Sequence, residues 1–193
     1  LTHGFTADER SLRAQAEACG ITDFVLLTQP DDVSLGACLN ALVAAADGDI
    51  LAKIDDDDLY GPNYLLDQAH ALRYTGADLV GKQAVYAYLE QRDELVMRSP
   101  EREHRYTTFV AGPTLVAPRH TLVEVPFEDR TRGEDSTLLR NITAQGGRVY
   151  STDRFNFVQR RAGHGHTWDV SDREFLANGV VETFGFNEQH VFC

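Results

Sequence analysis

Between residues 23 and 54 the chain alternates two short apolar runs with one capped helical segment, and this order restricts the fold more than any other feature. The run Asp23–Thr28 has the length and composition of a buried strand. Ser34 then suits a helix N-cap, and Gly48 suits the end of that helix. Ile50–Ile54 supplies the second apolar run. A strand–helix–strand unit with short links predicts a parallel sheet and an α/β fold.

The same signals recur along the rest of the chain. Helices are predicted at Thr6–Cys19, Pro62–Tyr74 and Glu134–Gln145, with a short one opening at Ser171. Strands are predicted at Asp78–Val80, Val85–Leu89, Glu94–Met97, Thr107–Val110, Thr114–Val116 and Arg148–Ser151. Neither a repeat nor a linker interrupts the pattern. We therefore expect one α/β domain over residues 1–193, built on a mostly parallel sheet flanked by helices.

Charge and composition exclude several functional classes. The net charge of −12 argues against a nucleic-acid partner, because phosphate backbones are bound by clustered Lys and Arg. No apolar run approaches the roughly 18 residues that span a bilayer. The cysteines Cys19, Cys38 and Cys193 are odd in number and widely spaced. This spacing predicts free thiols and a cytoplasmic location.

Four consecutive aspartates, Asp55–Asp58, directly follow the second apolar run. Adjacent carboxylates repel one another unless a cation offsets their charge. The carboxyl end of a parallel strand is also where open α/β sheets bind ligands. Hard oxygen ligands there suit Mg²⁺ or Mn²⁺, which can bridge to a substrate diphosphate. The alternative is a solvated acidic loop, but a run that ends a buried strand and precedes Gly61-Pro62 favours a metal site.

Two further motifs carry groups of the same chemistry. Glu134-Asp135 opens a predicted helix, where acids serve either as catalytic groups or as ordinary partners of the helix dipole. The segment Gly163–Trp168 contains two histidines, His164 and His166, and an imidazole can complete a metal shell. His-x-His spacing is also compatible with zinc, yet no other His or Cys lies near enough in sequence to reinforce that interpretation.

Taken together, these motifs resemble the family 2 glycosyltransferases of the GT-A fold, from about Leu35 to Trp168. The resemblance rests on Ser34–Asn40, Gly48–Ile50, Ile54–Asp58, Gly133–Asp135 and Leu138–Arg140. It implies metal-dependent transfer of a sugar from a nucleotide-diphosphate sugar to an acceptor hydroxyl, on a saccharide or another molecule, with inversion of the anomeric centre. It also implies Mn²⁺ or Mg²⁺ as cofactor.

The resemblance assigns roles to individual residues. Asp55 and Asp57 match the two acids of the family's metal-binding Asp-x-Asp element, and His166 resembles a C-terminal metal-binding histidine. Asp135 matches the general base, with Glu134 in support. Donor contacts are implied for Asn40, Lys53, Asp56 and Asp58, and acceptor contacts for Gly112, Thr114 and Trp168.

The sequence departs from the family pattern in two places. The family begins with a strand and a loop that hold the nucleotide base, whereas Leu1–Gly4 looks like the end of its second strand. A chain lacking the first strand has an uncovered sheet edge, so we expect self-association or an adjoining domain. Gln159–Arg161 matches only half of the Gln-x-x-Arg-Trp motif, which argues against processive polymer synthesis.

Two alternative functions remain open at this point. A sugar-phosphate nucleotidyltransferase shares the α/β layout and metal-held phosphates, but it carries a Gly-rich basic loop near its start that this sequence lacks. A non-catalytic module that binds divalent cations or carbohydrate would explain the acidic run without any base. Turnover of a nucleotide sugar separates such a module from an enzyme.

Overall fold

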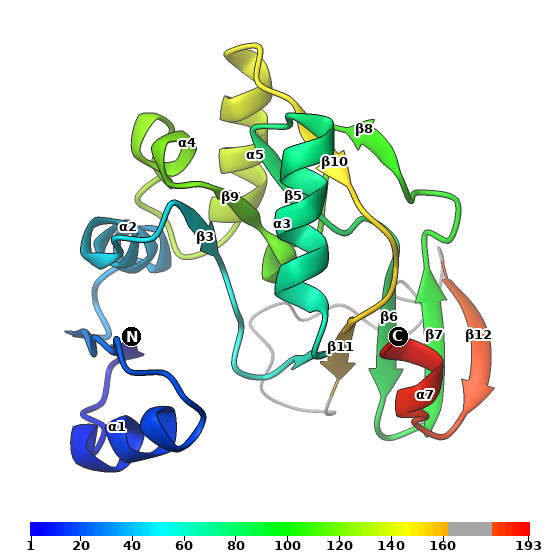
Figure 1. Cartoon of the computed structure of the whole chain (residues 1–193), viewed down its shortest axis with the longest axis horizontal. Helices are drawn as coiled ribbons and strands as arrows, with labels where there is room; N and C mark the ends of the chain where they lie inside the picture. The colour runs from blue at the N-terminus through cyan, green and yellow to red at the C-terminus, as the bar shows by residue number, and fades with distance from the viewer. Residues whose placement is uncertain (162–178) are drawn as a thin grey trace.

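The computed structural model describes residues 1–161 and 179–193, and these form helices around two five-stranded sheets and one two-stranded sheet (Figure 1). The helices are α1 Glu9–Ala18, α2 Leu35–Ala45, α3 Tyr64–Thr75, α4 Arg119–Glu124, α5 Glu134–Ala144 and α7 Glu188–Val191, with a 3-10 turn, η1, at Gly112–Thr114. The strands are β1 Thr2–His3, β2 Thr28–Gln29, β3 Ile50–Ala52, β4 Leu59–Tyr60, β5 Leu79–Gly81, β6 Val85–Leu89, β7 Glu94–Arg98, β8 Arg105–Thr107, β9 Val116–Pro118, β10 Val149–Ser151, β11 Phe157–Arg161 and β12 Gly179–Phe184. The α/β class is as predicted.

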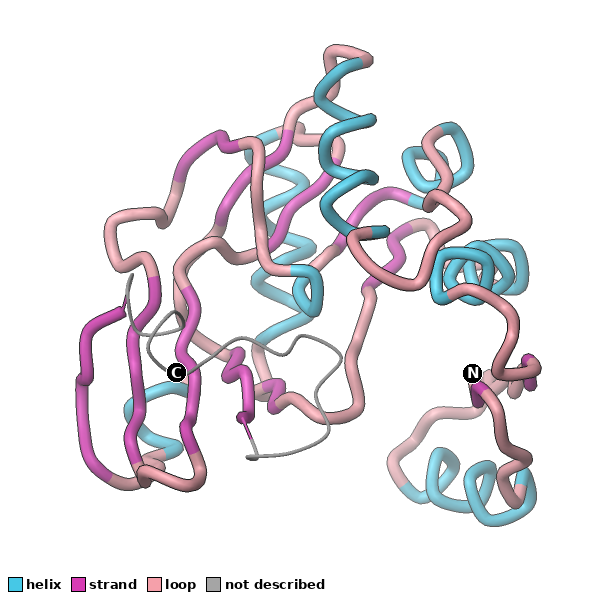
Figure 2. The backbone as a smooth tube through the Cα atoms, turned by 180° about the vertical axis from the view of Figure 1, so that it is seen from behind, coloured by secondary structure: helices cyan, strands magenta, loops and turns pink. Residues whose placement is uncertain are grey.

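The central sheet has the strand order β3-β9-β5-β10-β8. Its strands are mixed in direction, where the sequence predicts mostly parallel pairing: β5 and β10 run parallel, but β9 is antiparallel to both β3 and β5. Helices cover both faces, with α3 on one side and α5 on the other (Figures 1 and 2). Leu138, Leu139 and Ile142 of α5 belong to the larger buried apolar cluster, and Ala71 and Leu72 of α3 belong to a second.

The second sheet has the order β12-β7-β6-β11-β4 and lies below the central sheet in Figure 1. Its predicted hairpin, β6–β7, is confirmed with Leu89 opposite Glu94. Helix α7 packs on one face through Val191, which contacts the cluster around Tyr86 and Met97. Strands β11 and β12 were not predicted, because a strand that pairs with distant segments shows little local signal in the sequence.

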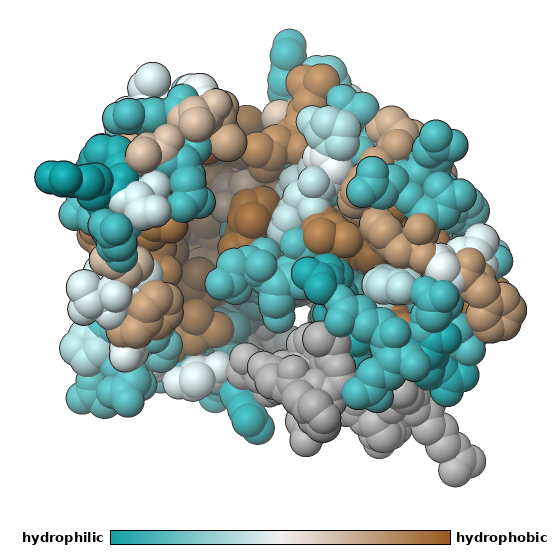
Figure 3. All heavy atoms as spheres, turned by 90° about the horizontal axis from the view of Figure 1, so that it is seen from below, coloured by the Kyte–Doolittle hydropathy of each residue, from teal (hydrophilic) through white to brown (hydrophobic). Residues whose placement is uncertain are grey.

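The N-terminal segment lies beside the rest of the molecule rather than inside its core. Among the described residues, strands β1 and β2 pair only with each other, in parallel, so the predicted strand–helix–strand unit does not form one sheet with β3. Helix α1 has no buried residue. Figure 3 shows apolar side chains lining a hollow between this segment, at left, and the remainder. The apolar run that predicted a strand over Asp23–Thr28 is therefore mostly outside regular structure.

One edge of β3 has no partner strand among the described residues, which agrees with the uncovered sheet edge that the sequence predicts. The Lys53 N–H donates to the Leu115 carbonyl and the Asp49 carbonyl accepts from the Arg119 N–H, so the backbone groups of these two residues point toward β9. The alternate residues Ile50, Ala52 and Ile54 therefore present their backbone groups to the open edge. Ile50 is 42% exposed and Ile54 is 50% exposed. The open edge of β3 is thus both apolar and free to pair.

Helix ends follow the local sequence with one correction. Ser34 caps α2 by accepting a hydrogen bond from the Ala37 N–H, as predicted. Gly76 ends α3 in the left-handed conformation, at φ 60°. Helix α1 begins later than predicted because Asp8, rather than Thr6, caps it. None of the helices in the described ranges is long and apolar enough to cross a membrane, and all three cysteines are free.

Candidate active site

The acidic run Asp55–Asp58 lies in the connection between the two five-stranded sheets. It follows β3 of the central sheet and precedes β4 of the second sheet. The hydroxyl of Tyr60 accepts a hydrogen bond from the Asp55 backbone N–H at 3.0 Å and donates to the Pro113 carbonyl at 2.9 Å. Tyr60 therefore holds the start of the acidic run against η1.

Three of the four carboxylates meet in space. One oxygen from each of Asp55, Asp57 and Asp58 lies within 4.8 Å of the other two, whereas Asp56 is exposed. Such an oxygen set fits Mg²⁺ or Mn²⁺, which bind a few carboxylates and complete their shells with water and phosphate oxygens. Asp58, assigned from the sequence to the donor, thus joins Asp55 and Asp57 as a candidate ligand. His166 and Trp168 lie outside the described residues.

Asp58 also ties the acidic run to the second sheet. Its Oδ1 accepts a hydrogen bond from the backbone N–H of Arg160, on β11, at 2.9 Å. Burial raises the pKa of Asp58 to about 7, against the lowering effect of that hydrogen bond, and the charges of Asp57 and Asp55 raise it further. Asp58 thus joins the acidic run to β11 from a partly buried position.

Lys53 lies between the acidic run and the start of α5. Its Nζ is 2.7 Å from Asp55 Oδ1 and 3.5 Å from Asp135 Oδ2, and it donates to the Gly112 carbonyl at 3.4 Å. Burial disfavours the ammonium group, but the charges of Asp135 and Asp55 outweigh this effect, so the pKa of Lys53 is raised. The family resemblance implied that Lys53 contacts the sugar donor. In the structure its ammonium group forms ion pairs with the carboxylates of Asp55 and Asp135.

Asp135 sits in the first turn of α5, which begins after Gly133 in a left-handed conformation at φ 76°. Its Oδ1 is buried and has no hydrogen-bond partner within the described part of the chain. Burial raises the pKa of Asp135 to about 6, Lys53 lowers it, and Glu134 raises it. A carboxylate that is ionised near neutral pH and has an unpartnered oxygen is suited to accept a proton.

Glu134 precedes Asp135 and is only 6% exposed. Within the described residues the ion pair with Lys53 is made by Asp135, while Glu134 acts on Lys53 through its charge. Adjacent residues at a helix start point in different directions. The structure therefore distinguishes the two acids by position, with Asp135 nearer the acidic run.

The turn η1 packs its first residue directly against Asp135. A Cβ added to Gly112 would lie 2.0 Å from Asp135 Oδ2, so any larger residue here must displace that carboxylate or η1. Thr114, the third residue, is fully buried; its hydroxyl donates to the Ala111 carbonyl at 2.7 Å and accepts from the Lys82 N–H at 2.9 Å. Thr114 therefore shapes the turn through its hydroxyl, and a contact between Thr114 and the acceptor stays a prediction.

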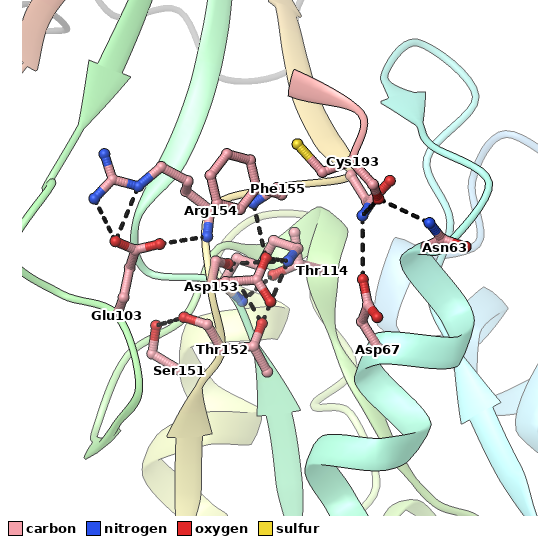
Figure 4. Close-up of polar contacts among 12 residues, drawn as sticks. Asn63, Asp67, Glu103, Thr114, Ser151, Thr152, Asp153, Arg154, Phe155 and Cys193 are labelled. Carbon is pink, nitrogen blue, oxygen red and sulfur yellow. Dashed lines mark hydrogen bonds and ion pairs between the residues drawn. The ribbon is translucent and has the colours of Figure 1, made fainter. Parts of the chain in front are cut away.

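A polar network in the segments that join the two five-stranded sheets supports η1 (Figure 4). The buried ammonium of Lys82 is 3.0 Å from Asp153 Oδ1 and 2.9 Å from the Asp153 carbonyl. Arg154, the next residue, donates from Nε to Glu103 at 2.9 Å, a pairing drawn at the left of Figure 4. Because the backbone of Lys82 also bonds Thr114, this network ties η1 to the linker between β10 and β11.

Asn40 holds α2 against the segment that contains Phe127. Its side chain donates to the Phe127 carbonyl at 2.9 Å and accepts from the Phe127 N–H at 3.0 Å, which uses both ends of the amide. Gly36, one turn earlier, allows α2 to approach the same segment, because a Cβ there would lie 1.9 Å from the Glu128 carbonyl oxygen. The Ser34–Asn40 motif thus docks α2 on the segment that leads into α5.

Sequence analysis did not predict the roles that two residues take at the site. Tyr60 joins the acidic run to η1, and its position two residues after that run was the available signal. Asp58 lies among the candidate metal ligands because the chain turns within the acidic run. The guanidinium of Arg160, whose backbone N–H bonds Asp58, pairs with Glu90.

The sequence profile of the family described as Glycosyl transferase family 2 matches residues 9–122, which include the acidic run and η1. The chain belongs to glycosyltransferase family 2. The match ends before Glu134 and Asp135, whose place in the site therefore rests on the structure. Among curated proteins, no sequence matches this chain.

Solved structures of glycosyltransferases share the fold. The mannosyltransferase PcManGT from Pyrobaculum calidifontis, in complex with GDP-Man and Mn²⁺, superposes with a TM-score of 0.61 at 17% identity, over 81% of this chain and 45% of its own. S. aureus TarS 1-349, in complex with UDP-GlcNAc, gives a TM-score of 0.59 at 13% identity, over 97% of this chain and 58% of its own. This family 2 chain thus has the GT-A fold, and it spans about half the length of these proteins.

Proposed function

We propose that this family 2 chain transfers a sugar from a nucleotide-diphosphate sugar to an acceptor hydroxyl, with inversion and with the help of a divalent cation. One observation carries the proposal: the carboxylate cluster Asp55, Asp57 and Asp58 and the carboxylate of Asp135 approach the same lysine from two sides. A metal site beside a candidate base is the minimum that such a transfer needs. GDP-Man and UDP-GlcNAc, bound by the two similar proteins, suggest which donors to test first.

The residues of the chain divide the chemistry between them. Asp55, Asp57 and Asp58 would hold Mn²⁺ or Mg²⁺, with His166 as a further candidate ligand. When bound, the cation supplies positive charge to the diphosphate that leaves. Asp135 accepts the proton of the acceptor hydroxyl through its carboxylate. The acceptor oxygen then bonds to the anomeric carbon as the bond from that carbon to the diphosphate oxygen breaks, and one such displacement inverts the centre.

The surroundings of the site suggest its remaining contacts. Asp56 is exposed at the acidic run and is proposed to face the donor. Gly112, against Asp135, and Trp168 are proposed to face the acceptor, which we take to be a saccharide or another hydroxyl compound. We also propose that residues 1–193 act as one domain in the cytoplasm. The open edge of β3 supports a second copy or an adjoining domain as a partner.

A screen of GDP- and UDP-sugars with Mn²⁺, Mg²⁺ or a chelator tests this function. We expect Mn²⁺-dependent binding of the matching nucleoside diphosphate by calorimetry and slow, metal-dependent release of that diphosphate from its sugar. Asp135→Asn keeps the shape of the side chain and removes its basicity. It is expected to retain nucleotide binding and to lower turnover by about 10²–10⁴-fold.

The control is Glu134→Gln, which removes the neighbouring acid. Full turnover in Asp135→Asn together with its loss in Glu134→Gln would exchange the roles of the two acids. Metal-dependent binding with no turnover of any nucleotide sugar would favour a non-catalytic binding module instead.

A further inference from the structure

Asp55 belongs to two groups of charges at once. One of its oxygens lies within 4.8 Å of oxygens from Asp57 and Asp58, and its Oδ1 is 2.7 Å from Lys53 Nζ. The same ammonium is 3.5 Å from Asp135 Oδ2. A cation entering the carboxylate cluster therefore approaches a positive charge that already neutralises one of its ligands.

Burial makes this competition stronger than it would be on an open surface. The side chain of Lys53 is 11% exposed, that of Asp135 is 19% exposed and that of Asp55 is 31% exposed. Charges shielded from solvent are screened less by water and salt than exposed pairs. The repulsion between Lys53 and an incoming divalent cation is therefore large enough to measure.

The backbone of Lys53 keeps the ammonium in place. Its N–H donates to the Leu115 carbonyl at 2.9 Å, immediately beyond the pairing of β3 with β9. The Gly112 carbonyl accepts a further hydrogen bond from Nζ at 3.4 Å. The contacts to Gly112 and Asp135 do not involve the carboxylate cluster, so the ammonium keeps two partners when Asp55 turns to another cation.

We propose that Lys53 is a built-in counter-cation, which weakens the binding of a free divalent cation at Asp55 and holds Asp135 in position when Asp55 is released. The proposal rests on the function proposed above and adds a regulatory property to the same site. A cation that arrives alone competes with Lys53. A cation that arrives with a nucleoside diphosphate brings extra oxygen ligands and negative charge that Lys53 attracts. Joint binding of the donor and the cation is therefore favoured over binding of the cation alone.

Titration of Mn²⁺ alone, followed by the electron paramagnetic resonance signal of the free ion at pH 8 and low salt, tests this inference. Lys53→Met is expected to bind Mn²⁺ about tenfold more tightly than the unmodified protein, because a single charge several ångströms from a divalent ion contributes at that level even in a water-like dielectric. Lys53→Arg keeps the charge and is expected to stay within about threefold of the unmodified protein. The increase in Mn²⁺ affinity in Lys53→Met is expected to become smaller as the salt concentration is raised.

Arg140→Gln is the matched control. It removes one positive charge from α5, the helix that carries Asp135, but at a side chain that is 68% exposed. It is expected to leave Mn²⁺ affinity unchanged, so a tenfold gain there would overturn the proposal by showing that net charge alone is responsible. Lys53→Gln replaces Lys53→Met if the latter does not give a cooperative thermal unfolding transition.

The remaining outcomes are also decisive. Equal or weaker Mn²⁺ binding in the neutral variants, or a tenfold gain in Lys53→Arg, would overturn the proposal. Absence of Mn²⁺ binding in every variant would also overturn it. Because the titration uses neither a donor nor an acceptor, failure to find sugar transfer would overturn the proposed function while leaving a tenfold gain in Lys53→Met as support for the inference.

Discussion

Replacing Gly112 with alanine moves Asp135 without touching the carboxylate cluster. The added Cβ would lie 2.0 Å from Asp135 Oδ2 and 2.9 Å from its Cγ, whereas contacts under 3.0 Å are essentially never observed for a Cβ atom. The carboxylate must therefore move by about 1 Å, or η1 must move by the same amount. Displacement of a catalytic group by 1 Å costs up to about 10²-fold in rate.

The expected result for Gly112→Ala is a fall in turnover of about 10²-fold with little change in Mn²⁺-dependent nucleotide binding, because Asp55, Asp57 and Asp58 keep their places. Overpacking is expected to lower the free energy of unfolding by about 1–3 kcal/mol. Release of nucleoside diphosphate from the donor sugar measures turnover, calorimetry measures binding, and thermal unfolding confirms that the variant is folded.

Two comparisons make the reasoning refutable. Gly48→Ala adds a Cβ whose nearest neighbour, the Ile50 carbonyl oxygen, is at 3.4 Å, so it is expected to be neutral. Gly112→Ala combined with Asp135→Asn is expected to be no slower than Asp135→Asn alone, since both changes act on one group. Unchanged turnover in Gly112→Ala, or losses that add fully in the double variant, would show that η1 does not position Asp135.

Three further predictions follow from the same geometry. Because burial raises the pKa of Asp135 to about 6, kcat/KM is expected to rise with pH between about 5 and 7 as the base ionises, and Asp135→Asn should lack this rise; a flat profile in the unmodified protein would contradict it. Asp57→Ala relieves repulsion among the acids, so it is expected to keep the fold by circular dichroism and to lose Mn²⁺-dependent nucleotide binding, with a smaller loss in His166→Ala; loss of the fold would make Asp57 structural. Ile50→Lys, on the open edge of β3, is expected to raise the dissociation constant for self-association about tenfold in analytical ultracentrifugation, and a strictly monomeric unmodified protein would refute the expectation.

Much of the fold was predictable because several signals are local. A serine at an N-cap, a glycine in the left-handed conformation after a helix, and two apolar runs around a polar turn act within a few residues. These signals correctly predicted α2, α3, α5 and the hairpin β6–β7. Strand pairing is not local. The antiparallel entry of β9 between β3 and β5 depends on segments more than thirty residues apart, and no local pattern encodes it.

The candidate site divides in the same way. The sequence by itself determined which residues are candidates for the chemistry, because four adjacent aspartates after an apolar run and an acidic pair at a helix start have recognisable composition and spacing. Only the tertiary structure decided which of these acids meet. It brought Asp58 into the cluster with Asp55 and Asp57, and it placed Lys53 between that cluster and Asp135.

The tertiary structure also gave two residues with predicted ligand contacts hydrogen bonds within the chain. The side-chain amide of Asn40 hydrogen-bonds to the backbone of Phe127. The hydroxyl of Thr114 donates to the Ala111 carbonyl and accepts from the Lys82 N–H. The sequence determines which polar groups a chain possesses. Whether a polar group binds a ligand or the chain's own backbone depends on which partner folding brings within hydrogen-bond distance once water is excluded, and that is decided only in three dimensions.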